Sequence, residues 1–393
     1  MSPQLIVVGA GLFGLTVARE AAERHGLHVL VLDRRSHLGG NAWSEADPET
    51  GIEVHRYGPH FFHTNNERVW TYLNRFTAFT PFSYRGQSNH RGEIFPLPVN
   101  LATINQFYRA AMSPDEARAR LREEASMYQG GPATNFEDKA ISLIGRPLYE
   151  AFFKGYTTKQ WQTDLRLLPA ETLTRLPIRY TYDNRWFNDK YQAQPADGYA
   201  AWMRSMADHP RIEVRLGVDF LSPTAEVNRG VVGRVPVVYT GPVDEYFGDA
   251  EGRLSWRTLD FHTEVHPTGD FQGTAIVNYA DVEVPWTRIV EYRHVHPERD
   301  YPADRTVTVK EFSRFADTPG DEPYYPVNAV EDRARLTRYR ARMEAEPLVW
   351  FGGRLGTYQY LDMHMAVAAA LSLMDNKLSP YLQTQTVGDP VAS

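Results

Sequence analysis

The sequence contains no cysteine among its 393 residues. This absence excludes disulfide bonds, metal sites built on thiolates, redox-active dithiols and attachment of a flavin through cysteine. The sequence also lacks an apolar run near the roughly 20 residues that a membrane-spanning helix needs, so no transmembrane segment is predicted. No basic stretch precedes the first apolar run, Leu5–Val8, so no secretory signal is predicted and we expect a cytoplasmic protein.

An excess of positive charge is also missing. The formal net charge of −7 gives no bulk electrostatic support for a nucleic-acid partner. Hydrophobic residues make up 42% of the chain and charged residues 23%, which is an ordinary composition for a globular protein. The length suggests two or three domains, so the chemistry has to be sought in the motifs.

The first motif joins a short apolar strand to a glycine-rich turn. Leu5–Val8 predicts a buried strand, and Gly9, Gly11 and Gly14 follow in the G-x-G-x-x-G spacing of dinucleotide-binding proteins. Gly9 permits the tight turn, Gly11 lets the backbone approach a pyrophosphate, and Gly14 lets the next helix pack on the strand. That helix, expected over residues 12–25, would point its N-terminus at the phosphates.

An acidic residue and a second pair of glycines refine this prediction. A second strand, expected over residues 28–32, ends at Asp33, where a carboxylate can bind a ribose hydroxyl. Gly39 and Gly40 follow the acid and offer another close backbone approach to the diphosphate. Such a pair is typical of flavoproteins of the glutathione-reductase type rather than of nicotinamide dehydrogenases. The stretch therefore predicts FAD as the cofactor.

The rest of the chain divides into helical and strand-rich segments. A clear helix start stands at Ser113, which is followed by proline and two acids. Consecutive strand patterns without intervening helices, between residues 243 and 334, predict an antiparallel sheet. Alternation also predicts a strand over 179–187. The helix expected over 362–374 is apolar nearly all round, so we expect it to be buried.

These patterns predict an α/β protein of α+β multi-domain type in three parts. Strands over 212–215 and 235–240 are expected to join the nucleotide-binding sheet, and a loop with two prolines and no apolar period is expected to form a lid. The parts are a Rossmann-like FAD-binding domain (1–80, 196–242 and 335–393), an inserted helical domain (99–165) followed by the lid loop (164–178), and an antiparallel sheet domain (81–98, 179–195 and 243–334).

Two histidines, His60 and His63, follow the turn signal Gly58-Pro59. Their spacing would present two imidazoles to a metal ion on a helix, but a segment that opens with Gly-Pro is a poor helix. No third ligand lies nearby in the sequence. We therefore predict no metal site and expect the two histidines to form hydrogen bonds near the flavin ring or to lie in the core.

Eight motifs, spread over nearly the whole chain, together resemble the UDP-galactopyranose mutase family of the bacterial type. Flavin amine oxidases share only the first two of them. The motifs are GAGLFG at 9–14, RRSHLGGN at 34–41, YGPHFFHT at 57–64, GYTTKQW at 155–161, RLPIRYTYDN at 175–184, TRIVEYRH at 287–294, EPYYP at 322–326 and GTYQYLDM at 356–363.

The resemblance implies an isomerase that uses FAD without net redox. It implies interconversion of UDP-galactopyranose and UDP-galactofuranose by ring contraction, with N5 of the reduced FAD as the nucleophile at the anomeric carbon. It also implies activation by NAD(P)H or another reductant, a supply of galactofuranose for cell-surface glycan and cell-wall synthesis, and a homodimer.

The resemblance also assigns the residues of the site. The catalytic positions are Arg175 and Arg288, which would clamp the diphosphate, and His63. The substrate-binding positions are these two arginines with Phe152, Phe153, Tyr156, Thr157, Trp161, Trp186, Asn278, Tyr325 and Tyr360. The cofactor-binding positions are Gly9, Gly11, Phe13, Gly14, Asp33, Arg34, Gly40, Asn41, His60, Phe61, His63, Arg354, Tyr360, Leu361, Asp362 and Met363.

Two of these positions are unusual, one because it lies in the expected lid and the other because its residue type differs from that of the family. Arg175 lies in the expected lid, so it would reach the substrate only when the lid closes. Trp186 stands where the family usually stacks uracil on a tyrosine; the indole can stack at least as well but lacks the hydroxyl.

Other interpretations remain open. An FAD-dependent oxidoreductase of the amine-oxidase-like class would share the nucleotide-binding motifs and would consume oxygen or another acceptor with its substrate. A flavin-binding regulator would perform no chemistry. Asp362 could also serve only as the N-cap of the last helix.

Overall fold

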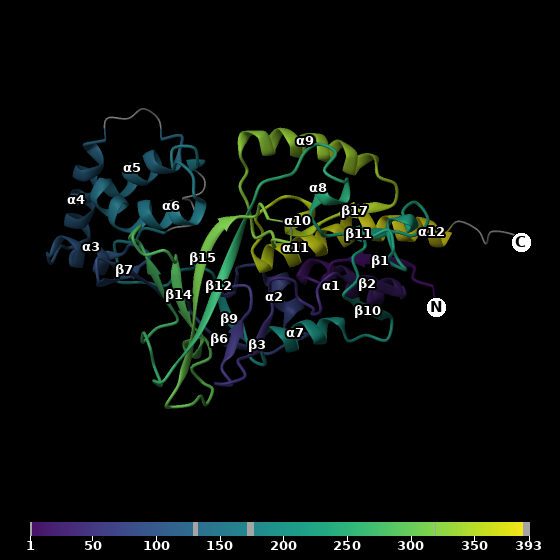
Figure 1. Ribbon diagram of the computed structural model, residues 1–393, viewed down its shortest axis with the longest axis horizontal. Helices are drawn as coiled ribbons and strands as arrows, with labels where there is room; N and C mark the ends of the chain where they lie inside the picture. Colours follow the sequence, from purple (N-terminus) through teal and green to yellow (C-terminus); the bar gives the residue numbers. More distant parts are fainter. Residues whose placement is uncertain (1, 129–132, 171–176, 319, 388–393) are drawn as a thin grey trace, which may run out of the picture.

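The computed structural model describes residues 2–128, 133–170, 177–318 and 320–387. Figure 1 shows a parallel sheet with its helices at one end of the molecule, a group of helices at the other, and the long strands of a second sheet between them. None of the helices in the described ranges is both long and apolar enough to cross a membrane. The fold is the mixed, multi-domain α/β type that the sequence predicts.

The parallel sheet has five strands in the order β10–β2–β1–β11–β17. Its central strand explains why a short run of the sequence is continuously apolar. Leu5 and Val7 belong to the core beneath α1, whereas Ile6 and Val8 belong to the core on the opposite face. The strands are β1 (Leu5–Val8), β2 (Val29–Asp33), β10 (Ile212–Leu216), β11 (Val237–Tyr239) and β17 (Val349–Phe351).

Helices from distant parts of the chain pack together on one face of this sheet. α1 (Leu12–His25) contacts α7 (Gly198–Ala207), α11 (Met363–Leu373) and α12 (Ser379–Val387). The prediction that α11 is buried all round is wrong: Val367 packs in the core, but Met365 is 39% exposed. One side of α11 packs against α1, whereas the side that carries Met365 is exposed.

The second sheet has seven strands in the order β16–β12–β15–β14–β13–β7–β8. All neighbouring pairs are antiparallel except β13 and β7, which are parallel. The expected antiparallel sheet is wrong at this pair, because the β7–β8 hairpin comes from an earlier segment and adds at the edge. The strands are β7 (Gly86–His90), β8 (Glu93–Leu97), β12 (Trp256–His266), β13 (Ile276–Tyr279), β14 (Arg288–Glu291), β15 (Thr306–Phe315) and β16 (Tyr325–Pro326).

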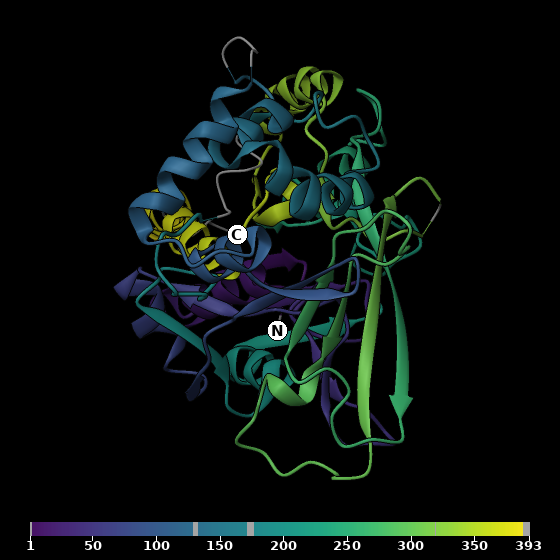
Figure 2. The same cartoon turned by 90° about the vertical axis from the view of Figure 1, so that its left-hand side faces the viewer.

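The helical group covers one end of this second sheet (Figure 2). Ser113 caps its second helix, as the sequence predicts, and also forms a reciprocal capping box with Glu116. Gly145, with φ of 75°, breaks the third helix before a π-helical segment that carries Phe152 and Phe153. The group contains α3 (Leu101–Tyr108), α4 (Pro114–Ser126), α5 (Phe136–Leu148), the π-helix (Tyr149–Lys154) and α6 (Gly155–Trp161).

Short elements connect these layers. They form one two-stranded sheet, one three-stranded sheet and several single helices. The elements are β3 (Ser44–Ala46), β4 (Glu53–His55), β5 (Phe62–Thr64), α2 (Glu67–Leu73), β6 (Phe79–Pro81), β9 (Tyr191–Pro195), a 3-10 turn (Arg229–Val231), α8 (Val243–Tyr246), a second 3-10 turn (Tyr292–His294), α9 (Val330–Ala345), α10 (Gly353–Gly356) and a π-helical turn (Met374–Leu378).

The strand predicted over residues 179–187 is wrong. This described segment is a loop, with one isolated bridge to Arg85. Its backbone bonds to separate partners: Arg179 N–H donates to the Val99 carbonyl, and Trp186 N–H donates to the Tyr84 carbonyl. Tyr180 packs on the core of the helical group and Phe187 on that of the second sheet, whereas Tyr182 is 68% exposed, so the alternation does not mark the two faces of a strand.

A buried ion pair joins the two central strands of the second sheet. Arg288 of β14 lies opposite Glu311 of β15, and its Nε donates to the Glu311 carboxylate at 2.6 Å. The Glu311 side chain is fully buried and that of Arg288 is 19% exposed. Glu311 is in phase with Val307 and Val309 along β15, so it faces inward where an apolar residue would be expected.

We predict that Glu311→Gln lowers the free energy of unfolding by about 3 kcal/mol, because it leaves the Arg288 charge buried without its partner. The double variant Glu311→Gln/Arg288→Met should recover part of this loss. Urea unfolding measures both changes. The matched control is Glu264→Gln, which breaks the exposed pair with Lys310 and should cost less than about 1 kcal/mol. An equal loss in Glu311→Gln and Glu264→Gln would contradict the prediction.

Candidate functional site

One cavity of about 990 Å³ runs between the parallel sheet, the second sheet and the helical group. Every residue that the sequence assigned to cofactor or substrate lines this cavity, apart from Arg175. Arg175 and residues 171–176 of the expected lid lie outside the described residues. Motifs from both ends of the chain therefore meet at one place, while the individual roles of these residues stay predictions.

The glycines at the end of β1 leave room along the cavity wall. A Cβ atom on Gly14 would lie 1.9 Å from the Gly9 carbonyl oxygen, so close packing of α1 requires glycine there. A Cβ atom on Gly11 would meet little but the Cα of Gly40 at 3.9 Å. Beside these glycines the side-chain amide nitrogen of Asn41, Nδ2, is buried without a hydrogen-bond partner among the described residues. An open backbone cradle with an unused donor fits the diphosphate of a dinucleotide.

Asp33 stabilises this cradle from the end of β2. Its carboxylate accepts a hydrogen bond from Ala10 N–H at 2.7 Å and another from Arg35 N–H at 2.9 Å. Arg34 and Arg35 both pair with Glu322, at 3.3 and 2.7 Å. The acid thus fixes the glycine turn, and its contact with a ribose hydroxyl stays a prediction.

The two histidines of the YGPHFFHT motif have different surroundings. Burial lowers the pKa of His60 to about 4. A hydrogen bond to the Gly58 carbonyl opposes this shift, whereas the nearby cations Arg354 and Arg288 add to it. His60 is therefore neutral near pH 7. His63 lies on β5, where its Nδ1 bonds to Asp189 at 2.8 Å.

Two of the arginines that line the cavity, Arg288 on β14 and Arg354 on α10, give one part of its wall a positive charge. Burial alone would lower the pKa of Arg288. The neighbouring Glu311 carboxylate has the larger effect and holds the pKa of Arg288 well above its usual value. Burial lowers the pKa of Arg354, and no carboxylate of the described residues lies within ion-pair distance of it. The rings of Tyr325 and Tyr360 stack beside them, with centroids 5.7 Å apart. This wall suits an anion that also accepts hydrogen bonds from hydroxyls.

The opposite end of the cavity is aromatic. Phe152 and Phe153 are buried, Thr157 is buried on α6, and Tyr156 and Trp161 line the cavity from the same helix. Trp186 lies against Tyr84, with centroids 5.1 Å apart. A Cβ atom on Gly86 would lie 3.1 Å from the indole, so glycine at this position leaves room for the Trp186 ring. Such a surface can stack on a nucleobase.

The second sheet and α6 are held together by a lysine that sequence reasoning missed. The Lys159 ammonium donates to four backbone carbonyls at 2.7 to 2.9 Å, those of Tyr279, Asp281, Val284 and Trp286. Asn278, at the start of the same segment, donates to the Gln87 carbonyl at 3.1 Å. Lys159 therefore fixes the aromatic helix relative to the strand that carries Arg288.

Comparisons with known proteins agree with this geometry. A family model for UDP-galactopyranose mutase matches residues 151–360, and a model for an NAD(P)-binding Rossmann-like domain matches residues 7–76. A probable UDP-galactopyranose mutase of Klebsiella pneumoniae is 43% identical over 95% of this chain and 94% of its own length. The chain belongs to the UDP-galactopyranose mutase family. It is thus a member of a family of isomerases, as the motifs predict.

Other relatives define the range of this family and its fold. A dTDP-fucopyranose mutase of Escherichia coli is 38% identical over 94% of this chain and 96% of its own. The crystal structure of a reduced UDP-galactopyranose mutase matches with a TM-score of 0.72 at 15% identity, over 99% of this chain and 98% of that one. A putative protoporphyrinogen oxidase from Exiguobacterium matches with a TM-score of 0.64 at 14% identity, over 98% and 100%. The two structures show the shared fold.

A pair of glycine variants separates fold from cofactor binding. We predict that Gly14→Ala lowers the thermal midpoint by several degrees, because its methyl group meets a backbone oxygen. Gly11→Ala should keep the thermal midpoint of the cofactor-free protein and lose bound dinucleotide, because its methyl group enters the cradle. Calorimetry and the absorbance of bound flavin measure the two effects. Full flavin content in Gly11→Ala would contradict the assignment of the glycine cradle to the cofactor.

His60 should make stability depend on pH. Its pKa in the folded protein is lowered to about 4, whereas in the unfolded chain it is about 6.5. The contribution of neutral His60 to the free energy of unfolding is complete above pH 6.5. As the pH falls toward 4, a stabilisation on the order of 2 kcal/mol is lost. We predict that His60→Asn removes this part of the acid destabilisation in urea titrations at pH 7.5 and 4.5. His262→Asn, at an exposed position, should behave as wild type.

Proposed function

We propose that this protein is a UDP-galactopyranose mutase that interconverts UDP-galactopyranose and UDP-galactofuranose with the aid of FAD. The observation that carries the proposal is the continuity of one cavity, from the glycine cradle to a wall with two arginines and a set of aromatic rings. Family membership supports the same conclusion. The proposal includes the three-part domain division drawn from the sequence.

The residues of the parallel-sheet side would hold the cofactor. The glycine turn, Asn41 and Arg34 would bind the diphosphate and the adenosine end. His60, Phe61, Arg354, Leu361 and Met363 would surround the ring system. When bound in its reduced form, FAD would supply N5 as a nucleophile toward the anomeric carbon of the sugar, without net redox.

The residues of the second sheet would bind the diphosphate of the substrate. Charge develops on this group as the glycosidic bond breaks, so cations placed beforehand lower the barrier. Glu311 engages Nε of Arg288, and the guanidinium also contacts Tyr325, so both side chains could meet the same phosphates. Tyr325 and Tyr360 would donate hydroxyl hydrogen bonds to the same group. Arg175 would complete this clamp from the lid.

The aromatic end would hold the nucleobase and exclude water from the sugar. Trp186 would stack on uracil in place of the usual tyrosine, with Phe152 and Phe153 beside it. Trp161 and Tyr156 would lie against the sugar. His63 would act beside the flavin. These assignments follow from the family resemblance and the common cavity.

The proposal has a cellular part as well. We infer a homodimer in the cytoplasm, reduction by NAD(P)H or another reductant, and a supply of galactofuranose for cell-surface glycans. The chief rival function is that of an FAD-dependent oxidase, since a putative oxidase shares the fold. A wall built to bind a diphosphate favours the mutase.

Anaerobic turnover tests the function. The protein is reduced with dithionite and given UDP-galactofuranose, and the nucleotide sugars are separated by chromatography. We expect UDP-galactopyranose to form only after reduction, with no consumption of oxygen in a parallel aerobic assay.

Arg288→Ala should lower the rate by about 10²- to 10³-fold while the flavin stays bound.

Two outcomes would count against this function. Oxygen uptake that depends on substrate, without pyranose product, would support the oxidase. Turnover of a dTDP-linked furanose but not of UDP-galactofuranose would place the chain with the dTDP-fucopyranose mutase among its relatives.

A further inference from the structure

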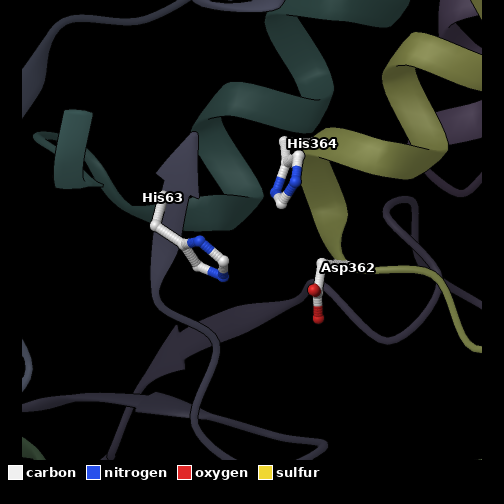
Figure 3. A group of neighbouring side chains, drawn as sticks. All are labelled: His63, Asp362 and His364. Atoms are coloured by element: carbon white, nitrogen blue, oxygen red, sulfur yellow. The ribbon is translucent and has the colours of Figure 1, made fainter. Parts of the chain in front are cut away.

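Three side chains that could bind a metal converge on one wall of the cavity. His63 comes from β5, whereas Asp362 and His364 stand at the start of α11, about 300 residues later. Figure 3 shows the two imidazoles and the carboxylate around a common space. One ligand atom of each residue lies within 4.8 Å of the other two. Sequence spacing alone predicts no metal site here, because no third ligand lies near His60 and His63 in the chain.

The ring of His63 is held in the orientation of a metal ligand. Its Nδ1 bonds to the Asp189 carboxylate at 2.8 Å, and the ring stacks on Phe187 with centroids 3.6 Å apart. Asp189 is itself fixed by the Asn65 amide at 2.7 Å. A proton on Nδ1 leaves the lone pair of Nε2 free. Histidine ligands of metals usually donate their other ring N–H to a carboxylate in this way.

The other two residues have uncommitted ligand atoms. The Nδ1 atom of His364 is buried and has no hydrogen-bond partner among the described residues. Asp362 occupies the N-cap position of α11, but its side chain accepts no capping hydrogen bond. A carboxylate at an N-cap ordinarily accepts such a bond from the helix. The cap alternative therefore does not account for the Asp362 side chain.

A second cluster in the molecule differs on this point. Asp270, Glu291 and His294 also lie close together. Their ligand atoms are already used, because His294 pairs with both acids and Glu291 accepts hydrogen bonds from Phe271 N–H and Gln272 N–H. This second cluster provides an internal control.

We propose that His63, Asp362 and His364 form a binding site for one divalent transition-metal ion, with zinc as its representative. Two imidazole nitrogens and one carboxylate oxygen are a ligand set that zinc prefers. Bonds of about 2.0–2.1 Å would bring the ligand atoms to roughly 3.3 Å from one another, a closure that side-chain rotations can supply. A water molecule would supply the fourth ligand from the cavity. Zinc binding here does not require the proposed mutase activity, although the site shares His63 with the proposed active site and Asp362 with the proposed flavin surroundings.

Equilibrium dialysis of the flavin-containing protein against ZnCl₂ tests the site, after chelator treatment and with bound zinc measured by atomic absorption. We expect one saturable equivalent per chain. His364→Ala should weaken binding at least tenfold, and Asp189→Asn should weaken it about 10- to 100-fold by releasing the His63 ring. His294→Ala, in the second cluster, should bind zinc as wild type does.

Three results would overturn the proposal. They are the lack of a saturable equivalent in wild type, unchanged binding in His364→Ala, and loss of binding in His294→Ala. Near-ultraviolet circular dichroism reports whether each variant is folded. His364→Gln provides a second test at the same position if the alanine variant unfolds. A rise in thermal midpoint on addition of zinc, present in wild type and absent in both His364 variants, gives an independent readout.

Discussion

The cavity depends on a charge that is kept inside the protein. A guanidinium taken out of water is stable only when a carboxylate or other hydrogen-bond acceptors compensate it. Glu311 supplies that carboxylate to Arg288 across two neighbouring strands. The pair spans the centre of the second sheet, so the whole sheet, with the Lys159 contacts that dock α6 on it, serves to hold one cation at a fixed place. A diphosphate is the natural complement of this wall.

The opposite wall is built by close packing rather than by charge. Gly14 lets α1 approach β1, Asp33 fixes the turn between them, and Gly11 and Gly40 leave the backbone uncovered. Because the two walls belong to different layers of the fold, a molecule bound to each would be brought face to face. This arrangement would allow the proposed pairing of a dinucleotide cofactor with a nucleotide sugar.

The sequence was a good guide wherever a local pattern has one physical cause. The strand–glycine–helix unit and the helix start at Ser113 both follow from nearby residues. The strand predicted at 179–187 was wrong, since alternating aromatics can also pack on several neighbours. Glu311 was missed although its phase with Val307 and Val309 is visible in the sequence. Lys159 and His364 could not be found, because their partners are brought to them only by the tertiary fold.

A crystal structure of the reduced protein with UDP-galactopyranose would show whether the two walls bring a flavin and a nucleotide sugar face to face. We expect the diphosphate against Arg288 and Tyr325, the uracil on Trp186, and the sugar between them and a flavin held on the glycine cradle. A diphosphate bound away from Arg288, or a nucleotide sugar that displaces the flavin from the cradle, would contradict it.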